Sequence, residues 1–249
     1  MAAQTIPILV GHRGWPAQYP ENTLGGFAAA VKAGARWLEC DVQISADGVP
    51  FVSHDVSLKR TAGLDRNITD MSAVELGAVA VGERSRFGER YASIKLPRLD
   101  ALIAWLGTQP QITQFVEIKR QSLRHHGSEL VVEKIMRAIQ PALKQCIVIS
   151  FDHVCLALAR QQGAPAIGWA VERTDDETRQ QADALQPDYM FTDEALFTRV
   201  HIAIPGSWRW ITYHTEDAGR ALELARQGAA FVETNDIGAL LSAPEFART

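Results

Sequence analysis

The sequence predicts an α/β protein folded as a (β/α)₈ TIM barrel with a small insertion after the second strand. Short β-rich apolar runs alternate with amphipathic helical stretches along the whole chain, the pattern typical of parallel strands joined by crossover helices. The runs number eight, which is the strand number of such a barrel. A length of 249 residues suits either one barrel or two small domains. The predicted strands are Ile6–Gly11, Trp37–Ile44, Thr113–Ile118, Cys146–Phe151, Ala166–Val171, Asp188–Phe191, Trp208–Tyr213 and Ala230–Thr234.

The stretches between these strands carry apolar residues at helical spacing. Glycines stand where such helices should end, and Thr174 and Glu177 have the spacing of a capping box. The apolar stripes are Leu24, Phe27, Ala28 and Val31; then Leu99, Leu102, Ile103 and Leu106; then Ala218, Ala221, Leu222 and Ala225. The glycines are Gly34, Gly107, Gly163 and Gly228.

Residues 55–98 do not fit the repeat of strand and helix. This segment is polar, contains glycine and is longer than a normal connection, so we expect an insertion at the carboxyl-terminal face of the barrel, where functional loops collect. Repeats, low-complexity tracts and interdomain linkers are not visible in the sequence. We therefore expect residues 1–249 to form a single barrel domain.

Composition excludes several classes of protein. A net charge of -4 and a pI near 6.0 argue against nucleic acid as a partner, because such proteins need an excess of Lys and Arg. The three cysteines are too few and too widely spaced for a disulfide framework or a cysteine metal site. No basic leader or long apolar run precedes the first strand or follows it. We expect a cytoplasmic protein without stable membrane insertion; its oligomeric state is not predicted.

Carboxylates indicate a metal site. Glu39 and Asp41 lie two apart in an extended run, so both side chains leave the same face of the strand, toward the barrel lumen. Glu117, at the end of the third predicted strand, can supply another oxygen. Oxygen ligands favour Mg²⁺ or Ca²⁺ over zinc. The alternative is a buried ion pair of Glu39 or Asp41 with Arg13 or Lys119, which can coexist with a metal.

Two histidines are candidates for proton transfer. His12 follows the first strand, and His54 follows the run Pro50–Ser53. A phosphodiester needs a base at the attacking hydroxyl and an acid at the departing oxygen, and imidazole serves both tasks near neutral pH. A lone histidine is more often a satisfied core or surface residue. The neighbouring Arg13 strengthens the functional interpretation of His12.

The remaining candidates surround this set. Arg13 is a bidentate donor suited to phosphate, and Lys119, which shares side-chain parity with Glu117, can neutralise charge on phosphate oxygens unless it is a solvated strand-end lysine. Glu21 and Asn22 either contact the site or cap the helix that begins near Thr23. Trp169 and Trp210 can border a substrate pocket, although core packing is the commoner fate of strand tryptophans.

Together these residues resemble the glycerophosphodiester phosphodiesterases, a branch of the phospholipase C-like phosphodiesterase superfamily. The resemblance is dense from Val10 to about Arg120 and follows the order and spacing of the family's motifs. The matching motifs are His12-Arg13-Gly14, Glu21-Asn22-Thr23, Glu39-Cys40-Asp41-Val42, Asp47-Gly48, His54-Asp55, Leu58-Lys59-Arg60-Thr61, Pro97-Arg98-Leu99 and Glu117-Ile118-Lys119.

The resemblance implies metal-dependent hydrolysis of a small-molecule glycerophosphodiester to sn-glycerol 3-phosphate and an alcohol, a reaction of lipid and glycerol metabolism. It implies Glu39, Asp41 and Glu117 as ligands of one divalent cation, Mg²⁺ or Ca²⁺, and an internal attack by the glycerol 2-hydroxyl through a cyclic phosphate. His12 and His54 would be acid and base, with Arg13 and Lys119 holding phosphate.

Downstream the resemblance loosens. Tyr213 stands where the family's Trp-Thr-Val-Asn run has Asn, and Asn235 replaces the Asp of a Thr-Asp-Pro run. These departures concern the choice of substrate more than the phosphate chemistry. Two alternatives follow: a related phosphodiesterase acting on lysophospholipids, which needs a larger apolar platform, and a non-catalytic barrel that binds phosphodiesters.

Overall fold

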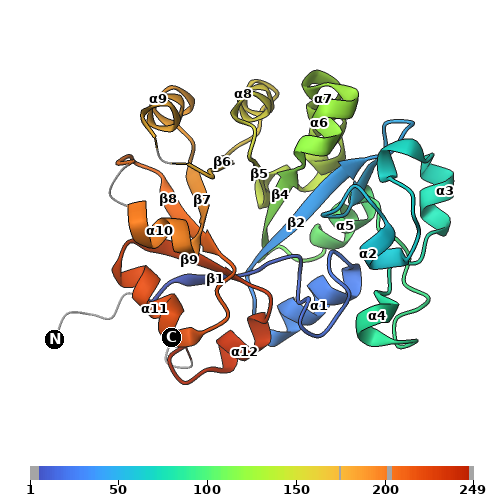
Figure 1. Cartoon of the computed structure of the whole chain (residues 1–249), viewed down its shortest axis with the longest axis horizontal. Helices are drawn as coiled ribbons and strands as arrows, with labels where there is room; N and C mark the ends of the chain where they lie inside the picture. Colours follow the sequence, from blue (N-terminus) through green and yellow to red (C-terminus); the bar gives the residue numbers. More distant parts are fainter. Residues whose placement is uncertain (1–5, 174, 201–203, 247–249) are drawn as a thin grey trace.

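The computed structural model describes residues 6–173, 175–200 and 204–246 and shows parallel strands surrounded by helices (Figure 1). The parallel strands are β1 Ile8–Gly11, β2 Trp37–Ile44, β4 Thr113–Ile118, β5 Cys146–Ser150, β6 Ile167–Ala170, β7 Tyr189–Asp193, β8 Arg209–Tyr213 and β9 Ala229–Thr234. They lie in the order β1-β9-β8-β7-β6-β5-β4-β2, and β1 also pairs with β2, which closes the ring. The predicted (β/α)₈ barrel is confirmed.

A short antiparallel strand, β3 Pro50–Val52, pairs with the end of β2 outside the ring. It is not among the predicted strands, because three residues are too few to show a period and proline is confined to strand edges and starts. The pairing continues beyond β3, since the backbone N–H of Ser53 donates to the carbonyl of Asp41 at 2.9 Å. This hairpin brings His54 next to the carboxylate-bearing end of β2.

Helices cover the outer face of the ring. They are α1 Leu24–Ala33, α5 Leu99–Leu106, α6 Arg120–His126, α7 Ser128–Ile139, α8 His153–Gln161, α9 Asp176–Leu185, α10 Glu194–Val200, α11 Ala218–Arg226 and α12 Ile237–Ser242, with a 3₁₀ helix, η2 Gln140–Gln145, before β5. Figure 1 shows α7, α8 and α9 along one side of the strands and α11 and α12 along another.

Side chains along β2 point alternately toward the helix layer and into the barrel lumen. Its outward residues Leu38, Cys40, Val42 and Ile44 are buried against the helix layer, whereas Glu39 and Asp41 point into the lumen. Burying one such Leu or Ile side chain contributes roughly 1.5–3 kcal/mol, so a one-residue register slip would expose this outer row and is strongly disfavoured. The hydrophobic outer row therefore fixes the inward direction of the carboxylates.

Aromatic side chains fill the barrel below the carboxylates. The ring of Trp37 lies 5.5 Å from that of Phe115 and 4.8 Å from that of Phe231, measured between centroids. Tyr189 joins them, 5.4 Å from Phe115. Packing of this kind makes the lumen a solid core rather than a pore. A ligand can therefore enter only from the carboxyl-terminal mouth.

The segment of residues 55–98 has short helices and its own apolar cluster. The helices are α2 Lys59–Ala62, η1 Ile68–Asp70, α3 Ala73–Ala78 and α4 Arg84–Phe87. Its cluster consists of Phe51, Leu58, Ile68, Met71, Leu76, Val81 and Leu96. Phe51 belongs to β3, just before the segment, and an antiparallel bridge joins it to Arg98 at the segment's end. A separate core lets this excursion hold its shape while it lies against β2 and the first loop.

Helix α1 ends at the predicted glycine, but its apolar stripe differs from the prediction at one position. Gly34 ends α1 with φ 116°, a conformation that glycine adopts without strain. Ala28, predicted for the apolar stripe of α1, is exposed, and Phe27 and Ala30 form the buried face instead. Thr174 lies outside the described residues, and the side chain of Asp175 caps α9 by accepting from the backbone N–H of Thr178.

Within the described residues, no helix combines the length and apolar composition that a membrane crossing requires. The three cysteines are free thiols, and all three are buried.

Candidate active site

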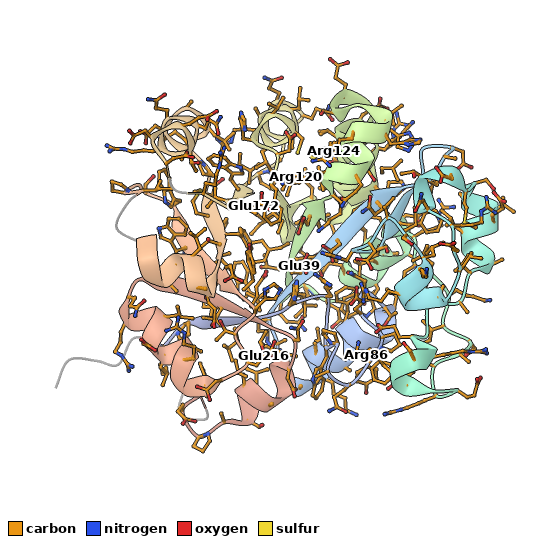
Figure 2. The ribbon with its side chains drawn as sticks, in the orientation of Figure 1. Glu39, Arg86, Arg120, Arg124, Glu172 and Glu216 are labelled. Atoms are coloured by element: carbon orange, nitrogen blue, oxygen red, sulfur yellow. The ribbon has the colours of Figure 1, made fainter. Side chains whose placement is uncertain are left out.

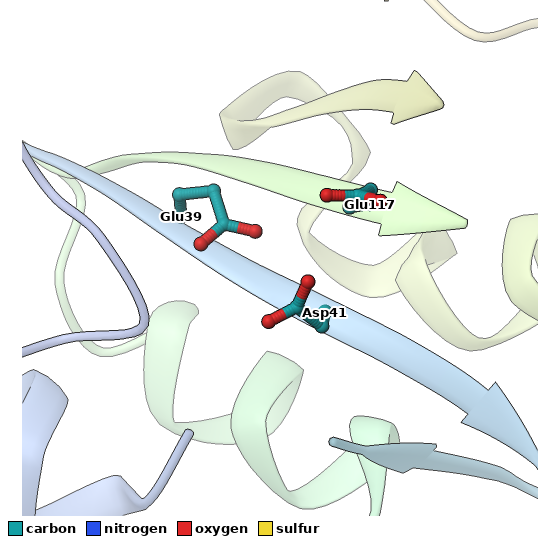
Figure 3. Close-up of side chains that lie close together, drawn as sticks. All are labelled: Glu39, Asp41 and Glu117. Atoms are coloured by element: carbon teal, nitrogen blue, oxygen red, sulfur yellow. The ribbon is translucent and has the colours of Figure 1, made fainter. Parts of the chain in front are cut away.

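Three carboxylates from two neighbouring strands converge in the lumen. Glu39 and Asp41 come from β2, and Glu117 on β4 is the register partner of Asp41 (Figure 3). One oxygen of each carboxylate lies within 4.8 Å of the oxygens of the other two. Figure 2 labels Glu39 among the side chains of the barrel. Glu39 and Asp41 are each 1% exposed, so the cluster lies inside the barrel rather than on its surface.

Burial and mutual repulsion disturb the titration of these groups. Burial, and after it the neighbouring Asp41, raises the pKa of Glu39 well above its usual value, and burial also raises the pKa of Glu117. For Asp41, burial alone would raise the pKa, but the Lys119 ammonium and the Arg13 guanidinium hold it well below its usual range. A cation placed among the three oxygens would relieve the repulsion.

Glu39 tests whether a metal fits this cluster. Its Oε1 is buried without a hydrogen-bond partner, whereas its Oε2 accepts from the backbone N–H of Arg13 at 3.0 Å. An unsatisfied buried carboxylate oxygen is costly. Together with Asp41 and Glu117 it offers hard oxygen ligands of the kind that Mg²⁺ and Ca²⁺ prefer. The donor set fits a divalent cation.

Two basic residues border the carboxylates. The Nε of Arg13 lies 3.1 Å from Oδ2 of Asp41. The Nζ of Lys119 lies 3.2 Å from Oδ1 of Asp41 and 2.8 Å from Oε1 of Glu117. The ion pairs that the sequence left as an alternative are thus present beside the carboxylate cluster. Lys119 is a buried residue that faces the lumen and not a solvated strand-end lysine.

His12 extends β1 into the mouth of the barrel. Its Nδ1 lies 2.9 Å from Oδ1 of Asn235, whose amide group donates to Oε1 of Glu216 at 2.7 Å. Because Glu216 fixes the orientation of that amide, the oxygen of Asn235 accepts the Nδ1 proton and leaves Nε2 of His12 without one. Burial, together with the charge of Arg13, lowers the pKa of His12 to about 3, so the ring is neutral at pH 7.

His54 stands on the hairpin that follows β3. Its Nδ1 lies 2.7 Å from Oδ1 of Asp55, and its carbonyl accepts from Nε2 of Gln43 at 3.0 Å. Burial lowers the pKa of His54, while the charge of Asp41 opposes this effect. The bond to Asp55 directs the opposite ring nitrogen, Nε2, away from that carboxylate.

Both histidines line one cavity of about 100 Å³ at the mouth of the barrel. The cavity is lined by the polar side chains of His12, Arg13, Glu39, His54, Glu117, Lys119, Tyr213, His214 and Glu233 and by the apolar side chains of Ile149, Phe151, Ala170 and Phe191. Asp41 is not in this lining, but it contacts Arg13 and Lys119, which are. The structure thus brings together the predicted metal, phosphate and proton-transfer residues.

The loop after β1 fixes Arg13 and Asp41 together. Arg13 and Asn22 both have positive φ, 52° and 57°, which is uncommon for residues with side chains. The amide of Asn22 donates to Oδ2 of Asp41 at 2.9 Å, and its carbonyl oxygen accepts from the backbone N–H of Asp41. Glu21 accepts from Arg13 at 3.4 Å. Thr23, rather than Asn22, caps α1.

The two tryptophans do not belong to the cavity wall. Trp169 packs in the outer core, where its ring contacts that of His153 and its indole N–H donates to the carbonyl of Phe151. Trp210 also faces the helices and contacts Phe197. Alternate residues of a strand point to opposite faces, and both tryptophans occupy positions that point toward the helices. The expectation that they border a substrate pocket is therefore wrong, and both pack in the core.

Several residues of the site were not predicted. Glu233 faces the cavity from β9, and its Oε1 is buried without a partner. Glu233 stands two residues after the lumen-facing Phe231, and residues two apart on a strand share a face, so strand alternation could have identified it. Asn235 and Asp55, which contact the two histidines, gave no such signal, because their importance depends on which side chains they reach.

The comparisons with known proteins agree on one family. The model of the glycerophosphoryl diester phosphodiesterase family matches residues 12–205. The Bacillus subtilis (strain 168) protein YqiK is 32% identical over 171 residues, covering 67% of this chain and 67% of YqiK. A glycerophosphodiester phosphodiesterase of Caldanaerobacter subterraneus subsp. tengcongensis is 30% identical over 151 residues, or 60% of each chain. These alignments span about two thirds of each relative or slightly less.

Solved structures support the fold at lower identity. A phosphodiesterase of Oleispira antarctica, in complex with the product sn-glycerol-3-phosphate, has a TM-score of 0.82 at 24% identity, covering 95% of this chain and 96% of that one. A glycerophosphodiester phosphodiesterase of Agrobacterium tumefaciens str. C58 has a TM-score of 0.75 at 21% identity, covering 96% and 100% of the two chains. At these identities the likeness concerns the fold.

Proposed function

This chain belongs to the glycerophosphoryl diester phosphodiesterase family, and from that premise we propose that it hydrolyses small glycerophosphodiesters to sn-glycerol 3-phosphate and an alcohol. The observation that carries the proposal is the convergence of one carboxylate cluster with two cationic side chains and two imidazoles around one cavity. The cluster is Glu39, Asp41 and Glu117, and the other groups are Arg13, Lys119, His12 and His54. Binding alone needs no paired acid and base, so this set favours a phosphoric diester hydrolase over a non-catalytic carrier.

Glu39, Asp41 and Glu117 are the proposed ligands of one divalent cation, Mg²⁺ or Ca²⁺. The partnerless Oε1 of Glu39 and the raised pKa values of Glu39 and Glu117 support this assignment. When bound, such a cation supplies charge stabilisation to phosphate oxygens and polarises the phosphoryl group.

Arg13 and Lys119 are proposed to hold the remaining phosphate oxygens. Both side chains are largely buried, and each already lies within 3.2 Å of Asp41, so they are oriented before a ligand arrives. Donors fixed in a water-poor site stabilise developing negative charge without the cost of reorganisation. Arg13 also keeps guanidinium nitrogens that can present two parallel donors to phosphate.

His12 is proposed to act as the base. Its neutral ring, with Nδ1–H donated to Asn235, leaves the Nε2 lone pair free to take a proton from the attacking hydroxyl. His54 is proposed to act as the acid, delivering a proton from Nε2 to the oxygen of the departing alcohol. Asp55 supports this role because a carboxylate at Nδ1 stabilises the protonated ring.

The lining of the cavity supports a small alcohol. A lysophospholipid needs an extended apolar platform for its acyl chain. Only a few of the residues that line this cavity are apolar, namely Ile149, Phe151, Ala170 and Phe191. We include a cytoplasmic setting and a role in glycerophospholipid breakdown in the proposal; the three free, buried thiols suit a reducing compartment.

A substrate panel on metal-stripped protein tests this function. The chain is assayed with glycerophosphocholine and, in parallel, lysophosphatidylcholine, with Mg²⁺, Ca²⁺ and Mn²⁺ restored in turn. We expect no turnover without metal and release of sn-glycerol 3-phosphate from the first substrate on restoring at least one cation. Tight binding of sn-glycerol 3-phosphate without turnover under any condition would instead favour a carrier, and faster cleavage of the lysolipid would favour the alternative substrate.

A further inference from the structure

Arg60, on α2 of the 55–98 segment, lies outside the cavity wall but contacts two of the side chains that support it. Its Nε lies 2.7 Å from Oδ2 of Asp55. Its two terminal nitrogens lie 2.8 and 2.7 Å from the two oxygens of Glu21, a fork-to-fork pair. One guanidinium therefore joins the hairpin of His54 to the loop of Arg13.

The Asp55 contact leads to His54. Asp55 accepts from Arg60 with Oδ2 and uses its other oxygen, Oδ1, at 2.7 Å from Nδ1 of His54. Since a histidine rotates about its side-chain bonds, the position of this carboxylate decides where Nε2 points. The carbonyl of His54 is held separately by Gln43. Arg60 thus acts on the direction of the ring, and Gln43 on the position of the backbone.

The Glu21 contact leads to Arg13. Glu21 is nearly buried and lies between two guanidinium groups, that of Arg60 and that of Arg13, the latter at 3.4 Å. The backbone N–H of Glu21 donates at 2.7 Å to Glu83, which like Arg60 belongs to the 55–98 segment. Arg13 reaches Asp41 with its Nε while its Nη1 lies against Glu21. Removal of Arg60 would leave a buried carboxylate to pull Arg13 away from the cavity.

We propose that Arg60 is a positioning residue that aligns His54 and Arg13 at the same time, through Asp55 and Glu21. The inference rests on the proposed function and deepens it, because it names a group that touches neither the metal ligands nor substrate. Lysine could not replace it, since a single ammonium cannot span both carboxylates in one plane as the guanidinium fork does. Through Arg60 alone, the 55–98 segment would orient two groups of the site without contacting substrate.

Arg60 could instead be a surface tether with no effect on the chemistry, as most exposed ion pairs contribute little. Arg66 supplies the matched control, because it lies in the same segment, pairs with Glu75 at 3.1 Å, and its side chain is 44% exposed, equal to that of Arg60. If both arginines only hold the segment, Arg60→Ala and Arg66→Ala should behave alike.

The experiment uses the full chain with its restored metal and measures kcat, KM and Tm for Arg60→Ala, Arg60→Lys and Arg66→Ala on glycerophosphocholine. We expect Arg60→Ala to lower kcat/KM by about 10- to 100-fold, with kcat reduced and KM raised, the loss typical of groups that orient site residues. Arg66→Ala should match the wild type in kcat and KM, and both alanine variants should melt within a few degrees of each other. Equal kinetics in the two alanine variants, or full recovery in Arg60→Lys, would overturn the inference.

Single variants separate the effect of Arg60 on His54 from its effect on Arg13. Asp55→Asn should mainly lower kcat, and Glu21→Gln should mainly raise KM, because the first carboxylate serves proton transfer and the second serves phosphate binding. Combining Asp55→Asn with Arg60→Ala should lower kcat no further than Arg60→Ala alone. Full additivity would mean that Arg60 does not act through Asp55, and would contradict the proposal.

A readout without substrate keeps the inference apart from the proposed function. In ¹⁵N-labelled protein at a pH where the ring is neutral, His54 should be the Nδ1–H tautomer in the wild type and a mixture in Arg60→Ala; His54→Ala identifies the signal. An unchanged tautomer in Arg60→Ala would overturn the role of Arg60 whatever the substrate. A wild type that is inactive on the whole panel, with the tautomer change present, would instead count against the proposed function alone.

Discussion

Replacing Glu39 by Gln should weaken the metal-dependent stability of this protein while making the metal-free form more stable. The substitution keeps the volume and removes one of three crowded carboxylates whose oxygens lie within 4.8 Å of one another. Burial and Asp41 already raise the pKa of Glu39, so ionisation of this carboxyl costs the metal-free fold free energy. The amide removes that cost and, with it, one ligand.

The size of the effect follows from mass action. A cation at about 100 times its Kd stabilises the wild type by about 2.7 kcal/mol, which for a chain of this size raises Tm by roughly 5–11 °C. If loss of Glu39 weakens binding about 100-fold, the same concentration stabilises the variant by only about 0.4 kcal/mol, or roughly 1–2 °C. The two proteins should therefore differ several-fold in their metal-induced shift.

Thermal melts of metal-stripped protein, with and without Mg²⁺, Ca²⁺ or Mn²⁺, measure both effects at pH 7.5. Glu129→Gln, a change at an exposed position on α7, is the control and should keep the full metal shift. An equal shift in Glu39→Gln and in the wild type would refute the assignment of Glu39 as a ligand. A lower Tm of the metal-free variant would refute the argument from carboxylate repulsion.

Two other predictions concern titration and proton transfer. Burial raises the folded-state pKa of Glu39, Glu117 and Glu233, so the stability that their protonated forms provide is complete below the unfolded value of 4.5 and is lost as pH rises through the folded values. Because the lowered pKa values of His12 and His54 act in the opposite direction below pH 6.5, melts of metal-free wild type and metal-free Glu39→Gln are compared between pH 5 and pH 8. The Tm of the wild type should fall relative to that of the variant as pH rises, and a wild-type Tm that rises relative to that of the variant would contradict the raised pKa of Glu39. His12→Ala and His54→Ala should each abolish turnover of glycerophosphocholine and leave the circular dichroism spectrum and Tm nearly unchanged. Activity retained by either variant would remove that histidine from the acid–base pair.

Strand alternation made the fold and the carboxylates predictable. The outward row of β2, from Leu38 to Ile44, has so strong a preference for burial against helices that Glu39 and Asp41 can only face the lumen. Parallel strands then bring Glu117 to the same level, because Asp41 and Glu117 are register partners. This part of the site depends on local period and barrel closure, both of which are properties of the sequence pattern.

Strand alternation, applied to every predicted strand, would also have excluded the tryptophans from the cavity lining. Trp210 directly precedes Ile211, which faces the lumen, so Trp210 must face the helices. Applied to β9, the rule also identifies Glu233, two residues after the lumen-facing Phe231. These two outcomes required no structure, only consistent use of parity along each strand.

The supports of the two histidines could not be predicted in this way. Asn235 reaches His12 from 223 residues away, and Arg60 reaches Glu21 from 39 residues away through side chains whose directions depend on their rotamers. The strand β3, which sets the place of His54, is three residues long and has no measurable period. Contacts made by side-chain tips, rather than by regular backbone, are therefore what the structure adds.

Diffraction from crystals soaked in Mn²⁺, recorded for anomalous scattering, tests the assignment of the three carboxylates as ligands of one cation. We expect one anomalous peak among the carboxylates of Glu39, Asp41 and Glu117, beside the cavity that His12 and His54 line. Oxygen distances of roughly 2.0–2.6 Å to all three residues would match a hard divalent cation. A peak elsewhere, or none at a Mn²⁺ concentration that supports turnover, would contradict it.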